Sequence, residues 1–370
     1  MNQLFFELIQ VALGTRICLT HTPTADEWKS LYDMAKKQSL VGVCFAGVQR
    51  LQQQRQEPPE MLYLTWMGMA AKIQQRNEVV NRQCVEMQAR LSADGFRSCV
   101  LKGQGVATLY TTTGSAQVGN LSGLRQSGDI DVWMDATKEE VIDYVMKNAP
   151  TNEFDQKHIH FHYFDNTEVE VHWYPVRWLS PKGRLLQSYF DSERERQFAN
   201  VVDGLCVPTA DFQLVHQLLH VYGHYVYEGV GMRQMMDLYF AQLACAKGLN
   251  GFEEFEKVRG LFKRLGLMRF VGATQWVLGQ VFQFPREQML CEPDADEGQK
   301  LLDEIIIGGN FGHHDERNHV DGESFFGRFF RRWGRKFRMF RFDPLGTILM
   351  PLSRIKLEIW MRKVKRKYNV

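Results

Sequence analysis

Apolar positions in the first ninety or so residues recur at helical spacing. Thr24 and Glu27 form a capping box, which predicts that a helix begins there. Pro58 and Pro59 open a longer helix, and Gly95 ends it. Its apolar positions advance by three, four or seven residues, which predicts a narrow packing stripe made of Leu62, Trp66, Met69, Ile73, Val80, Cys84, Met87 and Leu91. This first part of the chain is therefore predicted to be a helical brace for the segments after it.

The pattern changes after these helices. Residues 97–103 (RSCVLKG) predict a short buried strand that ends in a glycine, and residues 105–110 predict a helix after it. Residues 111–128 are rich in Gly, Ser and Thr and have no apolar periodicity, so they are predicted to form a loop. Residues 129–134 (DIDVWM) alternate between apolar and polar positions, which predicts a second strand.

A hairpin is predicted downstream of a second capping box, which Thr137 and Glu140 form at the start of another helix. Residues 158–164 (HIHFHYF) and 168–173 (EVEVHW) both alternate, and the dipeptide at 165–166 (DN) between them is typical of a turn. Strands and helices in this order predict a small α/β unit with a mixed sheet.

From about residue 209 the apolar spacing is helical again, and no internal repeat is present. The chain is therefore predicted to have an α+β fold in three parts. These are an N-terminal helical region (1–95), a minimal α/β core (96–208), and a C-terminal helical region (209–370) with a basic tail from about residue 326.

Composition indicates a globular protein with reduced cysteines. Hydrophobic residues make up 44% of the chain and charged residues 24%, which allows a sizeable core. The seven cysteines are odd in number and form no CxxC pair, which favours free thiols and a cytoplasmic location. The N-terminal apolar run lacks a positive start and contains Glu7, so we expect an amphipathic helix rather than a signal peptide. No stretch has the apolar length needed to span a bilayer.

The tail has a composition of its own, since residues 326–370 carry 14 Lys and Arg against Asp343 and Glu358. Aromatic residues lie between the basic ones. Three interpretations stay open: the solvated basic face of an amphipathic helix, contact with RNA through phosphates and stacking, and docking on an anionic membrane surface. The third would make a cytoplasmic protein membrane-associated through this tail.

Candidate chemistry lies in the segment SGDIDVWM, where Asp129 and Asp131 project to the same side of a strand. Two such carboxylates can hold hard divalent cations, and a two-metal site needs about three. Glu168 and Glu170 on the later strand are candidates for the third, because an acid in a valine-rich strand is costly unless it is paired or binds metal. By itself the Asp pair is weak evidence, since such pairs are often exposed turn carboxylates.

Alternating histidines lie near these acids. His158, His160 and His162 face one side of their strand, and His172 lies on the next strand. Zinc binding is one interpretation, although three same-face histidines on a flat strand rarely converge on one ion without another element. Lining of a nucleotide or acceptor pocket and polar packing are the alternatives.

Taken together, these motifs resemble the uncharacterised nucleotidyltransferase family of the polymerase-β-like superfamily. The resemblance covers roughly residues 95–245. It is carried by the LKG of 101–103, the Arg125-x-Ser127-x-Asp129-Ile130-Asp131-Val132 segment, Glu170-Val171-His172-Trp173, and Arg233 and Asp237 on a later helix.

The resemblance implies a catalytic and metal-binding role for three carboxylates. Asp129 and Asp131 would bind two Mg²⁺ ions that carry a nucleoside triphosphate, with Mn²⁺ as a substitute. Glu170 would complete one metal site and accept the proton of the attacking group. The implied reaction transfers a nucleoside monophosphate, with ATP as the expected donor, and releases pyrophosphate. The acceptor is open among a small molecule, a sugar, a protein side chain and tRNA.

Further residues are implied to lie around the nucleotide. The expected nucleotide contacts are Lys102, Gly103, Gln104, Arg125 and Ser127. The expected lining of the cleft comprises Glu168, His172, His160, Arg233 and Asp237. The chain departs from the superfamily at Gln104, where Gly or Ser commonly follows the first glycine, and in its long loop before Asp129. This departure leaves an alternative, a catalytically degenerate adaptor that binds RNA or an anionic membrane through the basic tail.

Overall fold

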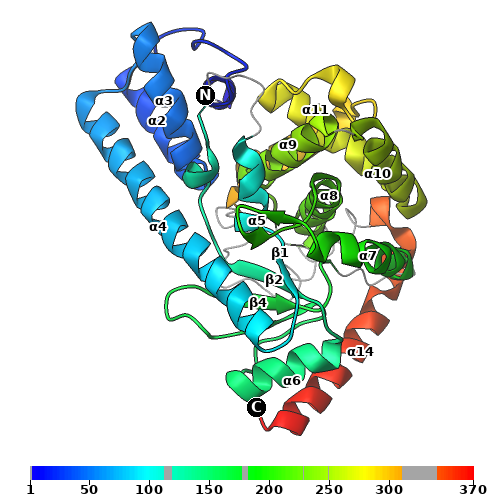
Figure 1. Cartoon of the computed structure of the whole chain (residues 1–370). Coiled ribbons are helices and arrows are strands. Elements are labelled where there is room, and N and C mark those ends of the chain that lie inside the picture. Colours follow the sequence, from blue (N-terminus) through cyan, green and yellow to red (C-terminus); the bar gives the residue numbers. More distant parts are fainter. Residues whose placement is uncertain (1, 112–118, 177–181, 228, 249, 311–339) are drawn as a thin grey trace, which may run out of the picture. The chain divides into compact units, whose positions relative to one another are not determined.

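The computed structural model describes residues 2–370 except 112–118, 177–181, 228, 249 and 311–339 (Figure 1). Helices dominate it, together with a four-stranded mixed sheet and a two-stranded sheet, so the predicted α+β class is confirmed. Every described helix is too short or too polar to cross a membrane.

Contacts divide the chain into two compact units. Unit 1 comprises Met1–Glu78, Ala107–Gln126 and Gln217–Arg332, and unit 2 comprises Val79–Val106, Ser127–His216 and Trp333–Val370. Because each unit gathers separate stretches of the chain, the three-part division by sequence stays a prediction. Residues 326–339 of the predicted basic tail lie outside the described residues.

Unit 1 is built from helices. Its complete described helices are α1 (Asn2–Leu13), α2 (Ala25–Lys37), α3 (Val41–Leu51), α9 (Met232–Lys247), α10 (Gly251–Leu265), α11 (Met268–Phe282) and α12 (Ala295–Gly308). The capping box of Thr24 and Glu27 is present at the start of α2, as predicted. Helix α11 packs against α1 and α12, and α12 was not predicted.

Two helices contribute residues to both units, α4 (Glu60–Ala93) and α8 (Ala210–Tyr227). The predicted stripe on α4 is largely buried, with Trp66, Ile73, Val80, Cys84, Met87 and Leu91 in the core and Leu62 and Met69 half-buried. Gly95 follows the helix with a φ of 89°, in the left-handed region that glycine occupies without strain. The sequence pattern therefore predicted both the length and the buried face of α4.

The sheet of unit 2 has the order β1-β2-β4-β3. Its strands are β1 (Ser98–Val100), β2 (Ile130–Met134), β3 (His158–His160) and β4 (Val169–His172). β2 pairs with β1 antiparallel and with β4 parallel, and β3 and β4 form the predicted antiparallel hairpin. A single bridge between Phe164 and Thr167 closes the predicted turn.

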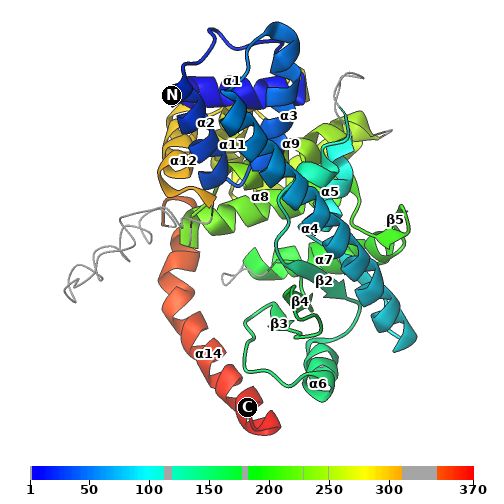
Figure 2. The same ribbon diagram turned by 90° about the vertical axis from the view of Figure 1, so that its left-hand side faces the viewer.

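One face of this sheet makes the hydrophobic core of unit 2. Ile130, Val132, Val169 and Val171 are fully buried there among side chains of α4 and of α6 (Lys138–Asn148). Figure 2 shows α6 beside β3 and β4. The predicted capping box of Thr137 and Glu140 starts α6. Because side chains alternate along a strand, the residues between these apolar ones must project from the opposite face.

Three further elements of unit 2 complete its packing. They are α7 (Lys182–Phe198), the hairpin of β5 (Val201–Val202) and β6 (Leu205–Cys206), and α14 (Pro344–Tyr368). Helix α14 (red in Figure 2) packs the last part of its length on the core, where the Trp360 ring lies 5.6 Å from that of Phe154 and 6.3 Å from that of Trp173. The C-terminal helix is thus part of unit 2.

Candidate active site

The parallel pairing of β2 with β4 sets Asp131 directly opposite Glu170. The backbone N–H of Ile130 donates to the carbonyl oxygen of Glu168 at 2.9 Å and fixes this register. Alternation then places five polar side chains on the face that points away from the core: Asp129, Asp131, Glu168, Glu170 and His172. Four predicted acids from two segments are therefore brought to one face of the sheet.

Asp131 is 4% exposed and has two cationic or polar partners. Its Oδ1 lies 2.6 Å from Lys102 Nζ and 3.0 Å from His172 Nε2. Burial alone would raise the pKa of Asp131, but the charge of Lys102 and the contact with His172 hold it below the ordinary value. Burial lowers the pKa of the Lys102 ammonium group, but the charges of Asp131, Glu170 and Asp129 raise it above its ordinary range. Asp131 is therefore held as a carboxylate in the folded protein.

Glu170 lies among histidines. Its Oε2 is 3.0 Å from His158 Nδ1 and 3.2 Å from His172 Nε2, and its Oε1 is 4.0 Å from His160 Nε2. Burial opposes ionisation here as well, but contacts with His158 and His172 hold the pKa of Glu170 far below its ordinary value. Glu170 is thus kept as a carboxylate, with one oxygen shared by two imidazoles.

Asp129 and Glu168 are exposed, so the acidic face opens to solvent at this end. Desolvation by the surrounding protein, followed by the charges of Asp131 and Glu170, raises the pKa of Asp129. Lys102 opposes this rise only in part. A carboxylate crowded by like charges is stabilised by an added cation, and oxygen ligands of this kind suit a hard divalent ion.

The turn after β1 carries Lys102 toward Asp131. Gly103 has a φ of 52°, which favours glycine, and a side chain at Gly105 would place its Cβ 2.2 Å from the Val100 carbonyl oxygen. The helix predicted after this turn is short: α5 (Gln104–Ala107) continues as a 3₁₀ segment (Thr108–Thr111). Gln104 donates to the side-chain oxygen of Asn81, so this side chain is held within unit 2.

We expect Gly105→Ala to destabilise the protein by about 1–3 kcal/mol, because the new methyl group overlaps a backbone oxygen that cannot move away as a side chain can. Denaturant unfolding would measure the change. Gly128→Ala is the matched control, since a Cβ at Gly128 meets nothing within 4 Å. Equal stability of the two variants would contradict this close approach.

Arg125 and Asp237, two further predicted site residues, pair with each other in unit 1. The buried guanidinium of Arg125 donates to both oxygens of Asp237, at 2.7 and 2.8 Å, and the Tyr110 hydroxyl donates to Asp237 Oδ1 at 2.6 Å. Arg233 Nη1 donates to the Gln126 carbonyl oxygen at 3.0 Å. These groups form a structural network, and the predicted roles in nucleotide contact and cleft lining stay predictions.

Ser127 belongs to unit 2, where it is half-buried and its hydroxyl has no hydrogen-bond partner within the described part of the chain. His216, which was not among the predicted site residues, is buried on α8, and its Nε2 lies 3.3 Å from the Pro175 carbonyl oxygen. Burial and then the nearby charge of Lys102 lower the pKa of His216 to about 3, so its imidazole is neutral.

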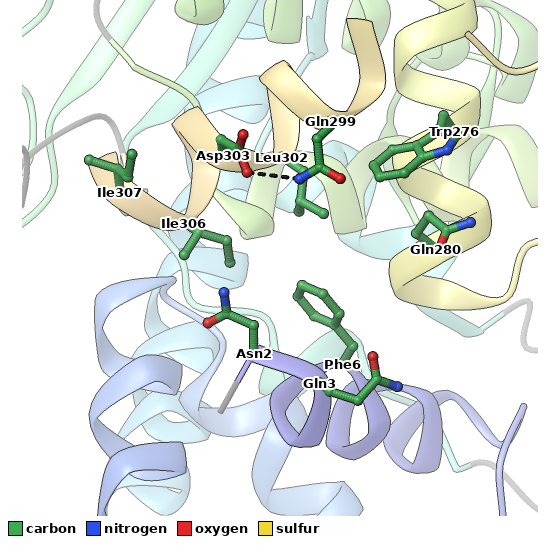
Figure 3. Close-up of a pocket in the computed structure, with 10 residues that line it drawn as sticks. All are labelled: Asn2, Gln3, Phe6, Trp276, Gln280, Gln299, Leu302, Asp303, Ile306 and Ile307. Carbon is green, nitrogen blue, oxygen red and sulfur yellow. Dashed lines mark hydrogen bonds between the residues drawn. The ribbon is translucent and has the colours of Figure 1, made fainter. Parts of the chain in front are cut away.

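A hollow of about 550 Å³ in unit 1 has different chemistry. Asn2, Gln3, Phe6, Trp276, Gln280, Gln299, Leu302, Asp303, Ile306 and Ile307 line it (Figure 3). Asp303 is the one ionisable side chain of this lining, and Gln299 donates to it at 2.8 Å. The hollow offers no group of converging acids, so the acidic face of the sheet is the stronger candidate.

Comparison with known proteins gives one family. The model of a family described as uncharacterised nucleotidyltransferase matches residues 24–283. This range contains Lys102, the acidic face of the sheet and the Arg125–Asp237 pair, and it ends before α14. No curated protein and no solved structure gives a significant match.

Proposed function

From the premise that the chain belongs to the uncharacterised nucleotidyltransferase family, we propose that it transfers a nucleoside monophosphate from a nucleoside triphosphate to an acceptor. ATP is the expected donor. The observation that carries the proposal is the parallel register of β2 and β4, which sets Asp131 opposite Glu170 with Asp129 at the exposed end. The acceptor belongs to one of four classes: a small molecule, a sugar, a protein side chain or tRNA.

The carboxylate oxygens of the acidic face fit Mg²⁺ as ligands. Asp129, Asp131 and Glu170 offer oxygen ligands on one face, and the raised pKa of Asp129 reflects desolvation together with the negative charge already gathered there. These three residues would hold two Mg²⁺ ions, or Mn²⁺ in their place. When bound, such ions neutralise phosphate charge and orient the attacking and leaving oxygens for in-line displacement.

The chain's own residues supply positioning and charge. Lys102 places an ammonium group 2.6 Å from Asp131, on the turn where the family resemblance expects the phosphates, and its raised pKa keeps it charged. Glu170 is held far below its ordinary pKa, which makes it a weak proton acceptor. We therefore assign Glu170 to metal binding rather than to general base catalysis. Positioning and electrostatic stabilisation then carry the reaction.

Calorimetric titration of ATP and GTP, with and without Mg²⁺, tests the proposal directly. We expect nucleotide binding that requires Mg²⁺ and disappears in the double variant Asp129→Asn/Asp131→Asn. Asp191→Asn is the matched control, because Asp191 is an exposed carboxylate on α7 of the same unit.

Absence of binding of both nucleotides in the presence of metal would contradict the proposal. The adaptor alternative would then lead, with α14 as its docking element. This helix exposes Ile348, Leu352 and Ile355 beside its basic residues.

A further inference from the structure

Two histidines and a carboxylate meet beside the acidic face. His158 comes from β3, and Glu170 and His172 come from β4. The second strand therefore supplies the additional ligands that the alternating histidines of one strand cannot provide. One ligand atom from each of the three lies within 4.8 Å of the others. We propose that His158, Glu170 and His172 bind a divalent first-row transition metal ion that favours imidazole nitrogen, such as Co²⁺ or Zn²⁺.

The spacing of the ligand atoms suits one ion. Glu170 Oε2 lies 3.0 Å from His158 Nδ1 and 3.2 Å from His172 Nε2. Ligands held at about 2.0–2.2 Å from a metal and at right angles to each other lie roughly 3 Å apart. The two imidazole rings meet edge to face with centroids 4.9 Å apart, so the two histidines lie side by side next to Glu170.

A hydrogen bond on the far side of the His172 ring fixes which of its two nitrogens carries a hydrogen. Its Nδ1 lies 3.3 Å from the Tyr174 carbonyl oxygen, which can only accept, so Nδ1 carries the hydrogen. Nε2 faces two carboxylate oxygens, Asp131 Oδ1 at 3.0 Å and Glu170 Oε2 at 3.2 Å, and it stabilises them only through a second proton on the ring or through a metal ion in its place. Lone pairs in this arrangement repel unless a proton or a metal ion lies between them.

A metal-bound histidine commonly donates its other N–H to a backbone carbonyl, as His172 does here. His172 is fully buried and His158 is 9% exposed, so bulk water does not solvate these nitrogens well. Imidazole nitrogens favour Zn²⁺, Co²⁺ and related ions, whereas Mg²⁺ prefers oxygen ligands. The cluster is therefore chemically distinct from an all-carboxylate magnesium site, although the two share Glu170.

Titration of the metal-free protein with Co²⁺, without nucleotide, tests this inference through the visible absorption of the bound ion. We expect one ion per chain, displacement by Zn²⁺, and no displacement by an equal concentration of Mg²⁺. His158→Gln should weaken Co²⁺ binding at least about tenfold, because glutamine keeps a polar side chain beside Glu170 but supplies no imidazole nitrogen. This variant separates metal binding from mere support of Glu170.

His162→Gln is the matched control, since His162 is the exposed histidine that follows β3. It should bind Co²⁺ as the unmodified protein does. His172→Gln should also lose binding, with circular dichroism to verify folding. Failure of the unmodified protein to bind Co²⁺, or equal binding by His158→Gln, would overturn the proposal and leave a proton on His172 as the group between the carboxylates.

This inference does not depend on nucleotide transfer, and Asp129→Asn distinguishes the two proposals. Asp129 is not one of the three proposed ligands, so Asp129→Asn should keep Co²⁺ binding while it weakens Mg²⁺-dependent nucleotide binding. Co²⁺ binding without any nucleotide binding would contradict the transferase proposal alone. Mg²⁺-dependent nucleotide binding without Co²⁺ binding would contradict the present inference alone.

Discussion

Asp131→Asn is expected to reduce nucleotide transfer at least about a thousandfold, a loss of ~4 kcal/mol in stabilisation of the transition state. Asparagine keeps the shape of the side chain but removes the charge that would bind metal. It also leaves the ammonium of Lys102, 2.6 Å away, without its closest counter-charge. Pyrophosphate release from ATP and Mg²⁺, with a mixture of candidate acceptors, would measure the change.

Asp191→Asn serves as the control for this variant, because it removes an exposed charge from the same unit and should leave turnover unchanged. Circular dichroism must show that Asp131→Asn is folded, since the substitution alters a buried ion pair. A folded Asp131→Asn protein with undiminished turnover would contradict the assignment of the site. Loss of turnover in both variants would point to a general effect of charge instead.

Much of the sheet could be predicted because apolar and polar residues alternate along a strand with a period of two. Asp129 and Asp131 were predicted on one face of a strand, and β2 does bury the residues between and after them. The parallel pairing that sets Asp131 opposite Glu170 could not be predicted, because β2 and β4 are separated by α6 and β3. Packing of the two strands over a common core selects that register among the possible ones.

Two helices, α7 and α12, were not predicted individually. α7 has many charged residues, and its few buried apolar side chains gain their environment from distant partners, as Phe198 does from Trp133 at 4.7 Å between rings. α12 did carry a local signal, since the Asp294 side chain accepts from the backbone N–H of Glu297 at its start. The burial of α7 depends on tertiary contacts, which the sequence does not show. The start of α12 depends on a local N-cap, which the sequence does show.

The histidines show a similar limit. Alternation predicted that His158 and His160 share a face, but the partner of each depends on the hairpin register, which pairs His158 with His172 and His160 with Glu170. Ion pairs between residues far apart in the sequence could not be predicted either. Arg125 and Asp237 are 112 residues apart, so their contact could not be predicted from spacing.

That buried pair is the centre of a network in unit 1. The Asn77 side chain donates to the carbonyl oxygens of Gly123 and Arg125, at 2.7 and 2.8 Å, and ties the same segment to α4. Asp237 accepts from Arg125 and Tyr110 and is 4% exposed. A buried ion pair contributes little net stability in itself, because the cost of desolvation offsets the attraction between the charges. Removal of one partner, however, leaves the other charge buried without a counter-charge.

Asp237→Ala is therefore expected to lower the free energy of unfolding by about 3–5 kcal/mol, since it leaves the guanidinium of Arg125 buried without a counter-charge. Urea unfolding would measure this loss. The double variant Arg125→Met/Asp237→Leu should recover part of it, because it replaces both charges by apolar groups. Glu292→Gln is the control: its ion pair with Arg286 is exposed on both sides and should contribute nothing measurable. Equal effects of Asp237→Ala and Glu292→Gln would show that solvent reaches the Arg125–Asp237 pair, and additive losses in the double variant would show that the two side chains act independently.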